Sequence, residues 1–270
     1  MSGRLRASDD AFLNVAQARR TLTSQVSELA TENRQLLELQ RLREQTTELI
    51  IHDLRNPLQG ITGAINMLRA SLPTGILQEN DDLFQLIVDN SNRMQRLIDS
   101  LLDISRLEAG EVKLALELSN LAVLLEAALN RTLPVLQARG ITAQLELPHD
   151  LPLVSIDVYM IDRVVTNLLD NAIKFMPGRG EITVSVDQGG KEVQVSVNDT
   201  GFGIPLDQRA YIFERFARGT NSPTPQRGFG LGLTFCRLAV EAHGGRIWME
   251  EGKGGAGSKF AFTLPTEIEV

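Results

Sequence analysis

The sequence is poor in the residues that would build a secreted or membrane-spanning protein. It has one cysteine in 270 residues, which excludes an intrachain disulfide and is typical of a reducing compartment. No apolar run approaches the ~20 residues that a transmembrane helix needs, and the residues after Met1 are polar, unlike a signal peptide. The net charge of −7 gives no general attraction to nucleic acid or anionic lipid. These absences predict a cytoplasmic chain that has no membrane span and binds no nucleic acid. Whether it stands alone or is the soluble part of a longer membrane-bound sensor stays open.

The stretch from Ala11 to Glu48 contains neither glycine nor proline, which favours one uninterrupted helix. Apolar residues recur in it at every seventh position, namely Val15, Leu22, Leu29 and Leu36. This heptad predicts a coiled coil over residues 1–48, and polar residues at some alternate seam positions would fix its register at a cost in stability. Two interpretations stay open: a plain dimerising rod, and a helix that transmits a signal by changing register.

A second helical pattern predicts a hairpin over residues 49–115. Its first apolar stripe has spacings of four and three residues: Leu54, Leu58, Ile61, Ile65, Leu68 and Leu72. Pro73 and Gly75 break this helix, and a second helix is expected from about Asp81 to Glu108, with Gly110 as its stop. One hairpin cannot bury both of its apolar faces, whereas two copies joined in a four-helix bundle can. The sequence therefore predicts a homodimer.

Helices and strands alternate over residues 116–270, which predicts a two-layer α/β domain. Helices are expected over residues 121–138 and 158–175, the second capped by Asp157, and a third is expected to end near Ala242. The runs "EITVSVD" and "EVQVSVN" alternate apolar and polar residues around a glycine pair, which predicts a β-hairpin. Further strands are expected at "GITAQLELP", "RIWMEE" and "KFAFTLP". The predicted fold class is thus α + α/β.

Two asparagines lie one helical turn apart in "NLLDNAIKF". Asn167 and Asn171 share a helix face because they are four residues apart, and Lys174 lies one turn further on. Amide oxygens suit Mg²⁺, whose remaining ligands are often phosphate and water, and a lysine can hold phosphate as a point charge. Taken alone, such a pair is more often a solvated helix surface.

The stretch "NDTGFGIP" places a carboxylate where a strand is expected to end. A buried Asp199 in that position can accept a hydrogen bond from an exocyclic amine such as that of adenine. Gly201 and Gly203 allow the backbone to approach a ligand closely. As a single motif, however, this stretch is more often an ordinary turn.

The stretch "GFGLGL" opens the last predicted helix and is a second glycine-rich motif. Glycines at a helix N-terminus are a phosphate-binding arrangement. Neither stretch fits the Walker loop or the dinucleotide-binding fingerprint. The binding residues predicted in this motif are Gly228, Gly230, Leu231 and Gly232.

Five motifs occur in a fixed order: "HDLRNPL", "NLLDNAIKF", "DTGFGI", "FERF" and "GFGLGL". This set resembles the histidine, asparagine, first glycine, phenylalanine and second glycine boxes of the sensor histidine kinases of two-component signalling. The resemblance covers about residues 49–266. It implies a helical dimerisation and phosphotransfer domain, followed by an ATP-binding sandwich of the type shared with DNA gyrase.

The resemblance also implies roles for the polar residues of the α/β domain. Asn171 matches the ligand of Mg²⁺, while Asn167 and Lys174 match positions near the phosphates. Asp199 matches the aspartate that binds adenine. The cofactors implied are therefore ATP and Mg²⁺.

A mobile lid over ATP is implied for about residues 202–229. Its cations are Arg215, Arg218 and Arg227, and we expect Arg218 to be the one that reaches the phosphates. The alternative, in which these arginines are solvated loop charges, stays open.

His52 is one of only three histidines in the chain. The heptad register places it just outside the hairpin core, with Asn56 on the same exposed face. A neutral imidazole is a nucleophile near neutral pH. The resemblance implies that His52 accepts a phosphoryl group, that Asp53 orients its ring, and that Asn56 helps water attack the phosphorylated partner. A further histidine, His243, lies at a helix end, where a cation or a donor suits the exposed carbonyls.

These observations predict an ATP- and Mg²⁺-dependent protein histidine kinase. It would phosphorylate His52, pass the group to an aspartate of a response regulator receiver domain in trans, and act as a phosphatase toward that regulator. The stimulus would come from an upstream sensor domain or a separate sensor protein. Two alternatives are a non-enzymatic dimeric signalling module, against which Asn171 and Asp199 argue, and a gyrase-like ATPase clamp, against which the paired helices argue.

Overall fold

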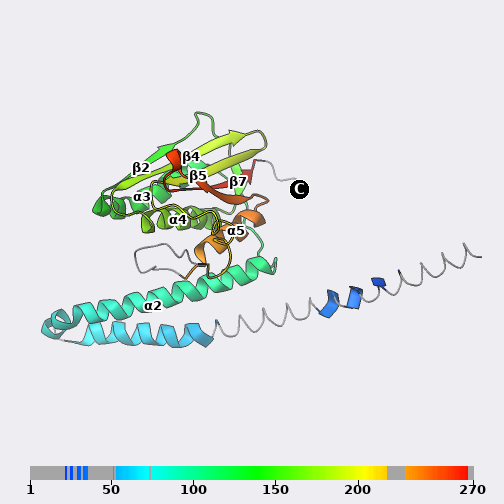
Figure 1. Ribbon diagram of the computed structural model, residues 1–270. Coiled ribbons are helices and arrows are strands. Elements are labelled where there is room, and N and C mark those ends of the chain that lie inside the picture. The colour runs from blue at the N-terminus through cyan, green and yellow to red at the C-terminus, as the bar shows by residue number, and fades with distance from the viewer. Residues whose placement is uncertain are drawn as a thin grey trace, which may run out of the picture. The chain divides into compact units, whose positions relative to one another are not determined.

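The computed structural model describes residues 22, 25–26, 29–31, 33–35, 51, 53–72, 74–217 and 229–266 (Figure 1). The chain divides into two units, residues 1–52 and residues 53–270. In the first unit most of the expected coiled coil lies outside the described residues. Those described between residues 22 and 35 are all helical, and Leu22, Val26 and Leu29 expose their side chains there.

The second unit begins with an antiparallel helical hairpin. Its first helix covers residues 53–71, and α2 covers Thr74–Glu108. Arg55 donates to Asp99 at 2.6 Å and Arg69 donates to Asp81 at 3.1 Å, so the two helices run in opposite directions. The expected start of the second helix near Asp81 is wrong, because the first turn of α2 accommodates a glycine, whose helix penalty is only about 1 kcal/mol. The predicted stop at Gly110 is confirmed, with a φ of 68°.

The hairpin buries only part of its apolar surface. Leu58, Ile65 and Ile98 are buried in it. Further apolar residues of the two helices are between 42% and 52% exposed, among them Leu54, Ile61, Leu68, Ile87 and Met94. The hairpin therefore presents apolar side chains to its surroundings along both helices.

A five-stranded mixed sheet forms one layer of the following domain. The strand order is β2-β4-β5-β7-β6, in which β2 pairs parallel with β4 and the other pairs are antiparallel. The strands are β2 (Ile141–Glu146), β4 (Gly180–Gly189), β5 (Glu192–Asp199), β6 (Ile247–Glu251) and β7 (Ser258–Pro265). The β-hairpin and the other three strands predicted from alternation are thus confirmed.

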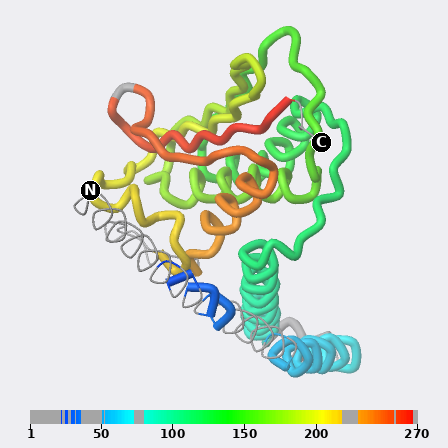
Figure 2. The backbone as a smooth tube through the Cα atoms, turned by 90° about the vertical axis from the view of Figure 1, so that its right-hand side faces the viewer, coloured from blue at the N-terminus to red at the C-terminus, as the bar shows by residue number. Residues whose placement is uncertain are grey.

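Three helices cover one face of this sheet, and the hairpin lies on the helical side, as the two views agree (Figures 1 and 2). The helices are α3 (Leu121–Arg139), α4 (Val158–Lys174) and α5 (Gly232–Ala242). Asp157 caps α4 as predicted, because its Oδ1 accepts from the backbone N–H of Met160 at 3.1 Å. None of the helices in the described parts of the chain is long and apolar enough to cross a bilayer.

A small second sheet was not predicted. β1 (Glu117–Ser119) pairs antiparallel with β3 (Val154–Ile156), and a single 3-10 turn covers Lys253–Gly255. Strands of three residues are too short to display an alternating pattern. This sheet joins the segment after the hairpin to the segment before α4.

The core lies between the five-stranded sheet and its helices. Val184 and Val197 face each other across the β4–β5 pair and are buried, as their alternation predicts. α2 also contributes to this core: Ile104 is fully buried in it, and Leu97 and Leu101 pack against it half-buried. The C-terminal part of α2 is therefore shared between the hairpin and the α/β domain.

Candidate functional site

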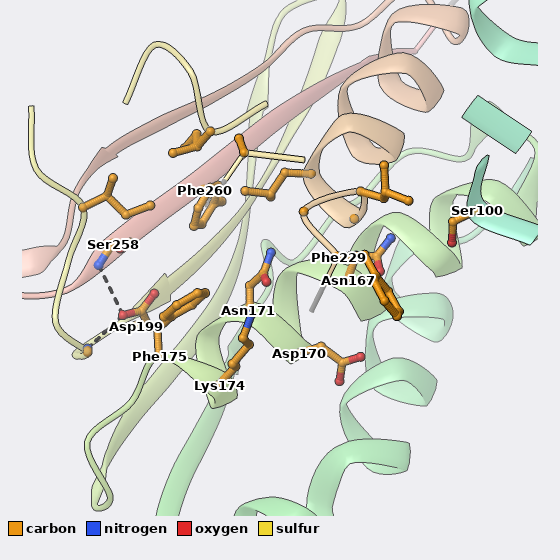
Figure 3. Close-up of a pocket in the computed structure, with 18 of the residues that line it drawn as sticks. Ser100, Asn167, Asp170, Asn171, Lys174, Phe175, Asp199, Phe229, Ser258 and Phe260 are labelled. Atoms are coloured by element: carbon orange, nitrogen blue, oxygen red, sulfur yellow. Dashed lines mark hydrogen bonds between the residues drawn. The ribbon is translucent and has the colours of Figure 1, made fainter. Parts of the chain in front are cut away.

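A cavity of about 1,810 Å³ opens between α2, α4, the N-terminus of α5 and the end of β5. It exceeds the about 300–1,000 Å³ usual for a small-molecule pocket, because it continues from the α/β domain to the hairpin. The predicted site residues that line it are Asn167, Asn171, Lys174, Asp199, Gly201, Gly203, Gly230, Leu231 and Gly232. Motifs distant in the sequence thus meet at one cavity (Figure 3).

Asp199 is the last residue of β5 and is only 3% exposed. Its Oδ1 accepts hydrogen bonds from the backbone N–H groups of Gly201 at 2.8 Å and Ser258 at 3.3 Å (Figure 3). Burial raises the pKa of this carboxyl, and the two backbone donors partly oppose the increase. Both of these donors use Oδ1, so among the described residues Oδ2 is left as an acceptor for a ligand.

Glycines let the backbone pack tightly around Asp199. A Cβ on Gly201 would lie 2.8 Å from both Oδ1 of Asp199 and the carbonyl oxygen of Phe175. A Cβ on Gly257 would lie 1.8 Å from the carbonyl oxygen of Asp199, and Gly257 also has a φ of 75°. Gly257 is a site residue that the motifs did not identify, although it lies in the glycine-rich run between β6 and β7.

The predicted polar face of α4 borders the same cavity. Asn167, Asn171 and Lys174 follow one another along α4, and Lys174 Nζ lies 4.6 Å from the ring centroid of Phe175 (Figure 3). The described residues contain no group of three His, Cys, Asp or Glu side chains able to hold a metal unaided. Amide oxygen is a suitable Mg²⁺ ligand, so an ion at Asn171 would take most of its remaining ligands from phosphate and water.

The second glycine motif packs against Phe216 and Ala217, which lie within the predicted lid. Phe216 donates its N–H to the carbonyl oxygen of Gly230 at 2.9 Å, and a Cβ on Gly230 would lie 2.6 Å from the carbonyl oxygen of Ala217. A Cβ on Gly232, at the start of α5, would lie 3.4 Å from Oδ1 of Asn167. The two ends of the segment between residues 217 and 229 are therefore held together beside the asparagine face.

The three predicted lid arginines have different outcomes. Arg215 is held at the end of α2, where its Nε donates to Oε1 of Glu108 at 2.8 Å and its Nη2 donates to Oε2. Arg218, Arg227 and the predicted binding residue Gly228 lie outside the described residues. Of the lid arginines, only Arg215 thus has a described position, and that position is an ion pair with the hairpin.

The predicted phosphoacceptor His52 also lies outside the described residues. Asp53 and Asn56 are exposed on the first hairpin helix, and neither lines the cavity. Arg55, which the sequence analysis did not select, does line it. The structure therefore brings the described binding residues of the α/β domain to one cavity, and the described hairpin residues Asp53 and Asn56 lie outside it.

Arg163 of α4 connects the hairpin to both helices of the site. It pairs with Asp103 and donates to Oγ of Ser100 at 3.1 Å, and both of these partners belong to α2. Its guanidinium carbon lies 3.9 Å from the ring centroid of Phe235 on α5. Sequence reasoning did not find Arg163, because neither spacing nor motif relates it to its partners.

His243 is buried at the C-terminus of α5 and is not a cation there. Its Nε2 accepts from the backbone N–H of Asp157 at 3.0 Å, so the proton is on Nδ1, which donates to the carbonyl oxygen of Ala239 at 2.7 Å. Burial lowers the pKa of this imidazole. Of the two expected roles, the donor to a helix carbonyl is confirmed, and the cation is not realised because Nε2 accepts a hydrogen bond.

Two family models match the chain in succession. Residues 42–110 match the His Kinase A (phospho-acceptor) domain, and residues 156–268 match the histidine kinase-, DNA gyrase B-, and HSP90-like ATPase. The adaptive-response sensory kinase SasA of a Synechococcus species is 34% identical over 95% of this chain. The alginate biosynthesis sensor protein KinB of Pseudomonas aeruginosa is 35% identical over 84% of it. The chain spans 68% and 37% of the lengths of these two relatives.

Solved structures agree with these matches. Full-length ShkA in complex with AMPPNP superposes with a TM-score of 0.72 at 26% identity, over 83% of this chain and 46% of that one. The nucleotide-free catalytic domain of the histidine kinase ThkA gives a TM-score of 0.51 at 28% identity, over 57% of this chain and 99% of that one. The predicted succession of a helical region and a gyrase-like α/β domain is confirmed.

Proposed function

Because the chain belongs to the family of sensor histidine kinases, we propose that it phosphorylates His52 with ATP and Mg²⁺ and passes the phosphoryl group to an aspartate of a separate response regulator. The observation that carries this proposal is the convergence of three sequence motifs on one cavity beside the hairpin. The AMPPNP bound to the structurally similar ShkA supports an adenine nucleotide as the ligand. ATP as the donor favours action in the cytoplasm.

The residues around the cavity divide the work of nucleotide binding. Oδ2 of Asp199 accepts a hydrogen bond from the exocyclic amine of adenine. Gly201 has no side chain, which lets its backbone N–H come close enough to donate to Oδ1 of Asp199. Asn171 contributes its amide oxygen to Mg²⁺, which neutralises phosphate charge in phosphoryl transfer. Asn167 and Lys174 bind phosphate oxygens, and backbone N–H groups at the start of α5 add donors there.

The remaining predicted binding residues belong to the glycine motifs and the lid. Gly203, Gly228, Gly230, Leu231 and Gly232 form its glycine-rich backbone, and Arg218 brings a cation from the lid to the phosphates. This assignment rests on the motif order and on the cavity that the described members share.

The hairpin supplies the phosphoacceptor and the dimer contact. Asp53 orients the imidazole of His52, and Asn56 assists water in removing the phosphoryl group from the regulator. The exposed apolar side chains of both hairpin helices are those that a four-helix bundle of two copies would bury. The proposed organisation is a signalling helix over residues 1–48, a phosphotransfer hairpin over 49–115 and an ATP-binding domain over 116–270, with input from an upstream sensor.

Phosphate labelling tests the proposal directly. The chain is incubated with γ-labelled ATP and Mg²⁺, and we expect acid-labile, alkali-stable label on the protein. The label should be lost in His52→Gln and kept in His149→Gln, a matched change at an exposed turn. Label that persists in His52→Gln would contradict the assignment.

The same assay separates the two alternative functions. ATP binding without any label on the wild-type chain would favour a non-enzymatic signalling module. Release of free phosphate without label on the protein would favour a gyrase-like ATPase clamp.

A further inference from the structure

We propose that Arg93, on the hairpin helix α2, is a phosphate-binding residue of the nucleotide site. It would give the hairpin a direct contact with the nucleotide that the α/β domain binds. The inference rests on the proposed function, since it requires a nucleoside triphosphate in the cavity. It adds a ligand-binding residue outside the motifs of the α/β domain.

Arg93 lies at the cavity beside the second glycine motif. It lines the same cavity as Asn171 and Gly230, and its guanidinium carbon lies 4.9 Å from the ring centroid of Phe229. Phe229 directly precedes Gly230 in the second glycine motif. Arg93 therefore lies beside the second glycine motif.

Contacts with the α/β domain hold α2 beside the site. α2 packs against α5. Arg163 binds Ser100 and Asp103, which are two to three helical turns beyond Arg93 on the same helix. Ile104 is buried in the core of the α/β domain. These contacts fix α2 against the helices that carry the asparagine and glycine motifs.

Arg93 differs from the other arginines of the cavity in its hydrogen bonds and ion pairs. Arg55 donates to Asp99 at 2.6 Å, Arg163 is paired with Asp103, and Arg209 donates to the carbonyl oxygen of Ile204 at 3.0 Å. Each of them already serves a contact within the protein. The arginines that line the cavity are Arg55, Arg93, Arg96, Arg163 and Arg209.

Arg96 is also engaged, while Arg93 retains its donors. Arg96 Nε donates to the carbonyl oxygen of Asn92 at 3.3 Å, and its charge acts on the nearby carboxyl of Asp170 by lowering the pKa that burial raises. Within the described parts of the chain, Arg93 has its contact with the Phe229 ring and neither a hydrogen bond nor an ion pair. Asp89, one turn earlier on α2, instead accepts from Gln85 at 3.1 Å.

The chemistry of the guanidinium group suits Arg93 to bind phosphate. A cation-π contact satisfies the charge of a guanidinium in part but consumes none of its five N–H donors. Those donors form a planar fork that matches phosphate oxygens, and such charge-assisted bonds are roughly twice as strong as neutral ones. Arg93 is thus held beside the glycine motif by Phe229, with its donors available to an incoming triphosphate.

Binding measurements on the full chain test this assignment. Calorimetry would compare a non-hydrolysable ATP analogue with adenosine, each with Mg²⁺, for the wild type, Arg93→Ala and Arg93→Lys. The matched control is Arg69→Ala, which removes a hairpin arginine that pairs with Asp81 away from the cavity. We expect Arg93→Ala to weaken the analogue roughly tenfold, as for loss of one charge-assisted hydrogen bond, and to leave adenosine unchanged. Arg93→Lys should lie between Arg93→Ala and the wild type, and Arg69→Ala should match the wild type.

The outcomes distinguish this inference from the proposed function. Equal affinities of Arg93→Ala and the wild type for the ATP analogue would overturn the role of Arg93 and leave the nucleotide site standing. An equal loss for adenosine would also overturn it, because Arg93 would then act only by supporting Phe229. A wild-type chain that binds neither ligand would remove the proposed function and this inference together.

Discussion

Replacing Asp199 with asparagine should separate ligand binding from folding. Asparagine has the same shape, and its Oδ1 can still accept from the N–H groups of Gly201 and Ser258, which both use Oδ1 of the aspartate. Its Nδ2 would then occupy the place of Oδ2 and present donors to a ligand whose exocyclic amine is also a donor. One acceptor is lost, and one buried donor is left without a partner.

The magnitude follows from those two changes. A hydrogen bond to a charged group contributes about 1.5–3 kcal/mol, and an unsatisfied buried donor costs about 1–3 kcal/mol. Together they predict a loss of about 3 kcal/mol or more, which is about a hundredfold or more in the dissociation constant of an ATP analogue. Calorimetric titration of the wild type and Asp199→Asn measures this directly.

The stability of the same variant should not fall. Because burial raises the pKa of Asp199 above its ordinary 3.8, ionisation of this carboxyl costs the folded protein stability, and that stability is lost as the pH rises through the raised value. Asp199→Asn removes this cost, so its free energy of unfolding at pH 7 should equal or exceed that of the wild type in urea titrations. Binding within about threefold of the wild type would refute the acceptor role, and destabilisation beyond about 2 kcal/mol would show that the charge itself supports the fold.

Two further predictions concern the attachment of the helices. The pKa of His243 lies below its ordinary 6.5, so its neutral ring should contribute fully to the free energy of unfolding above pH 6.5. Below that pH the contribution should decrease by up to about 1.4 kcal/mol per pH unit, until the lowered pKa is reached. Urea unfolding at pH 5.5 and 7.5 tests this, and His243→Gln should lessen the difference between the two. Arg163→Ala should cost about 1–3 kcal/mol, because the pair with Asp103 is only partly buried while the contact with Phe235 adds a cation-π term. A double-mutant cycle with Asp103→Ala should give a coupling of about 1 kcal/mol, and a coupling below about 0.3 kcal/mol would mean that the pair adds nothing.

Features with local chemical causes were predictable from the sequence. Asp157 caps α4 with its own side chain, and Gly110 ends α2 through its own backbone conformation. The β4–β5 hairpin follows from alternating valines around a glycine pair. In each of these cases the residues that determine the structure are neighbours in the chain.

Features that depend on packing were not predictable in the same way. The start of α2 at Thr74 was missed because Gly75 resembles a break, although one glycine is a small penalty in a helix of 35 residues. β1 and β3 are too short to show a period. Ile104 belongs to a helix that the sequence assigns to the hairpin, and nothing local indicates that it enters the core of the α/β domain.

The residues of the site show the same difference between local causes and packing. Asn171 and Asp199 were selected by motif, and both line one cavity. Arg163 and Gly257 were missed, because their importance comes from what they touch: two helices in one case and the backbone of Asp199 in the other. Arg215 was predicted as a lid cation, and its ion pair with Glu108 depends on a contact across more than a hundred residues.

The burial of Ile104 has a mechanical consequence for α2. At 1.5 Å per residue, a helix of 35 residues is about 50 Å long. One end of it is anchored by a side chain whose truncation typically costs about 2–5 kcal/mol, while the apolar side chains along the hairpin remain exposed. A rotation of α2 about its axis would therefore force α4 and α5 to repack or to turn with it. α2 therefore couples the hairpin mechanically to the α/β domain. A rotation imposed on the hairpin would be transmitted to α4 and α5, which border the cavity.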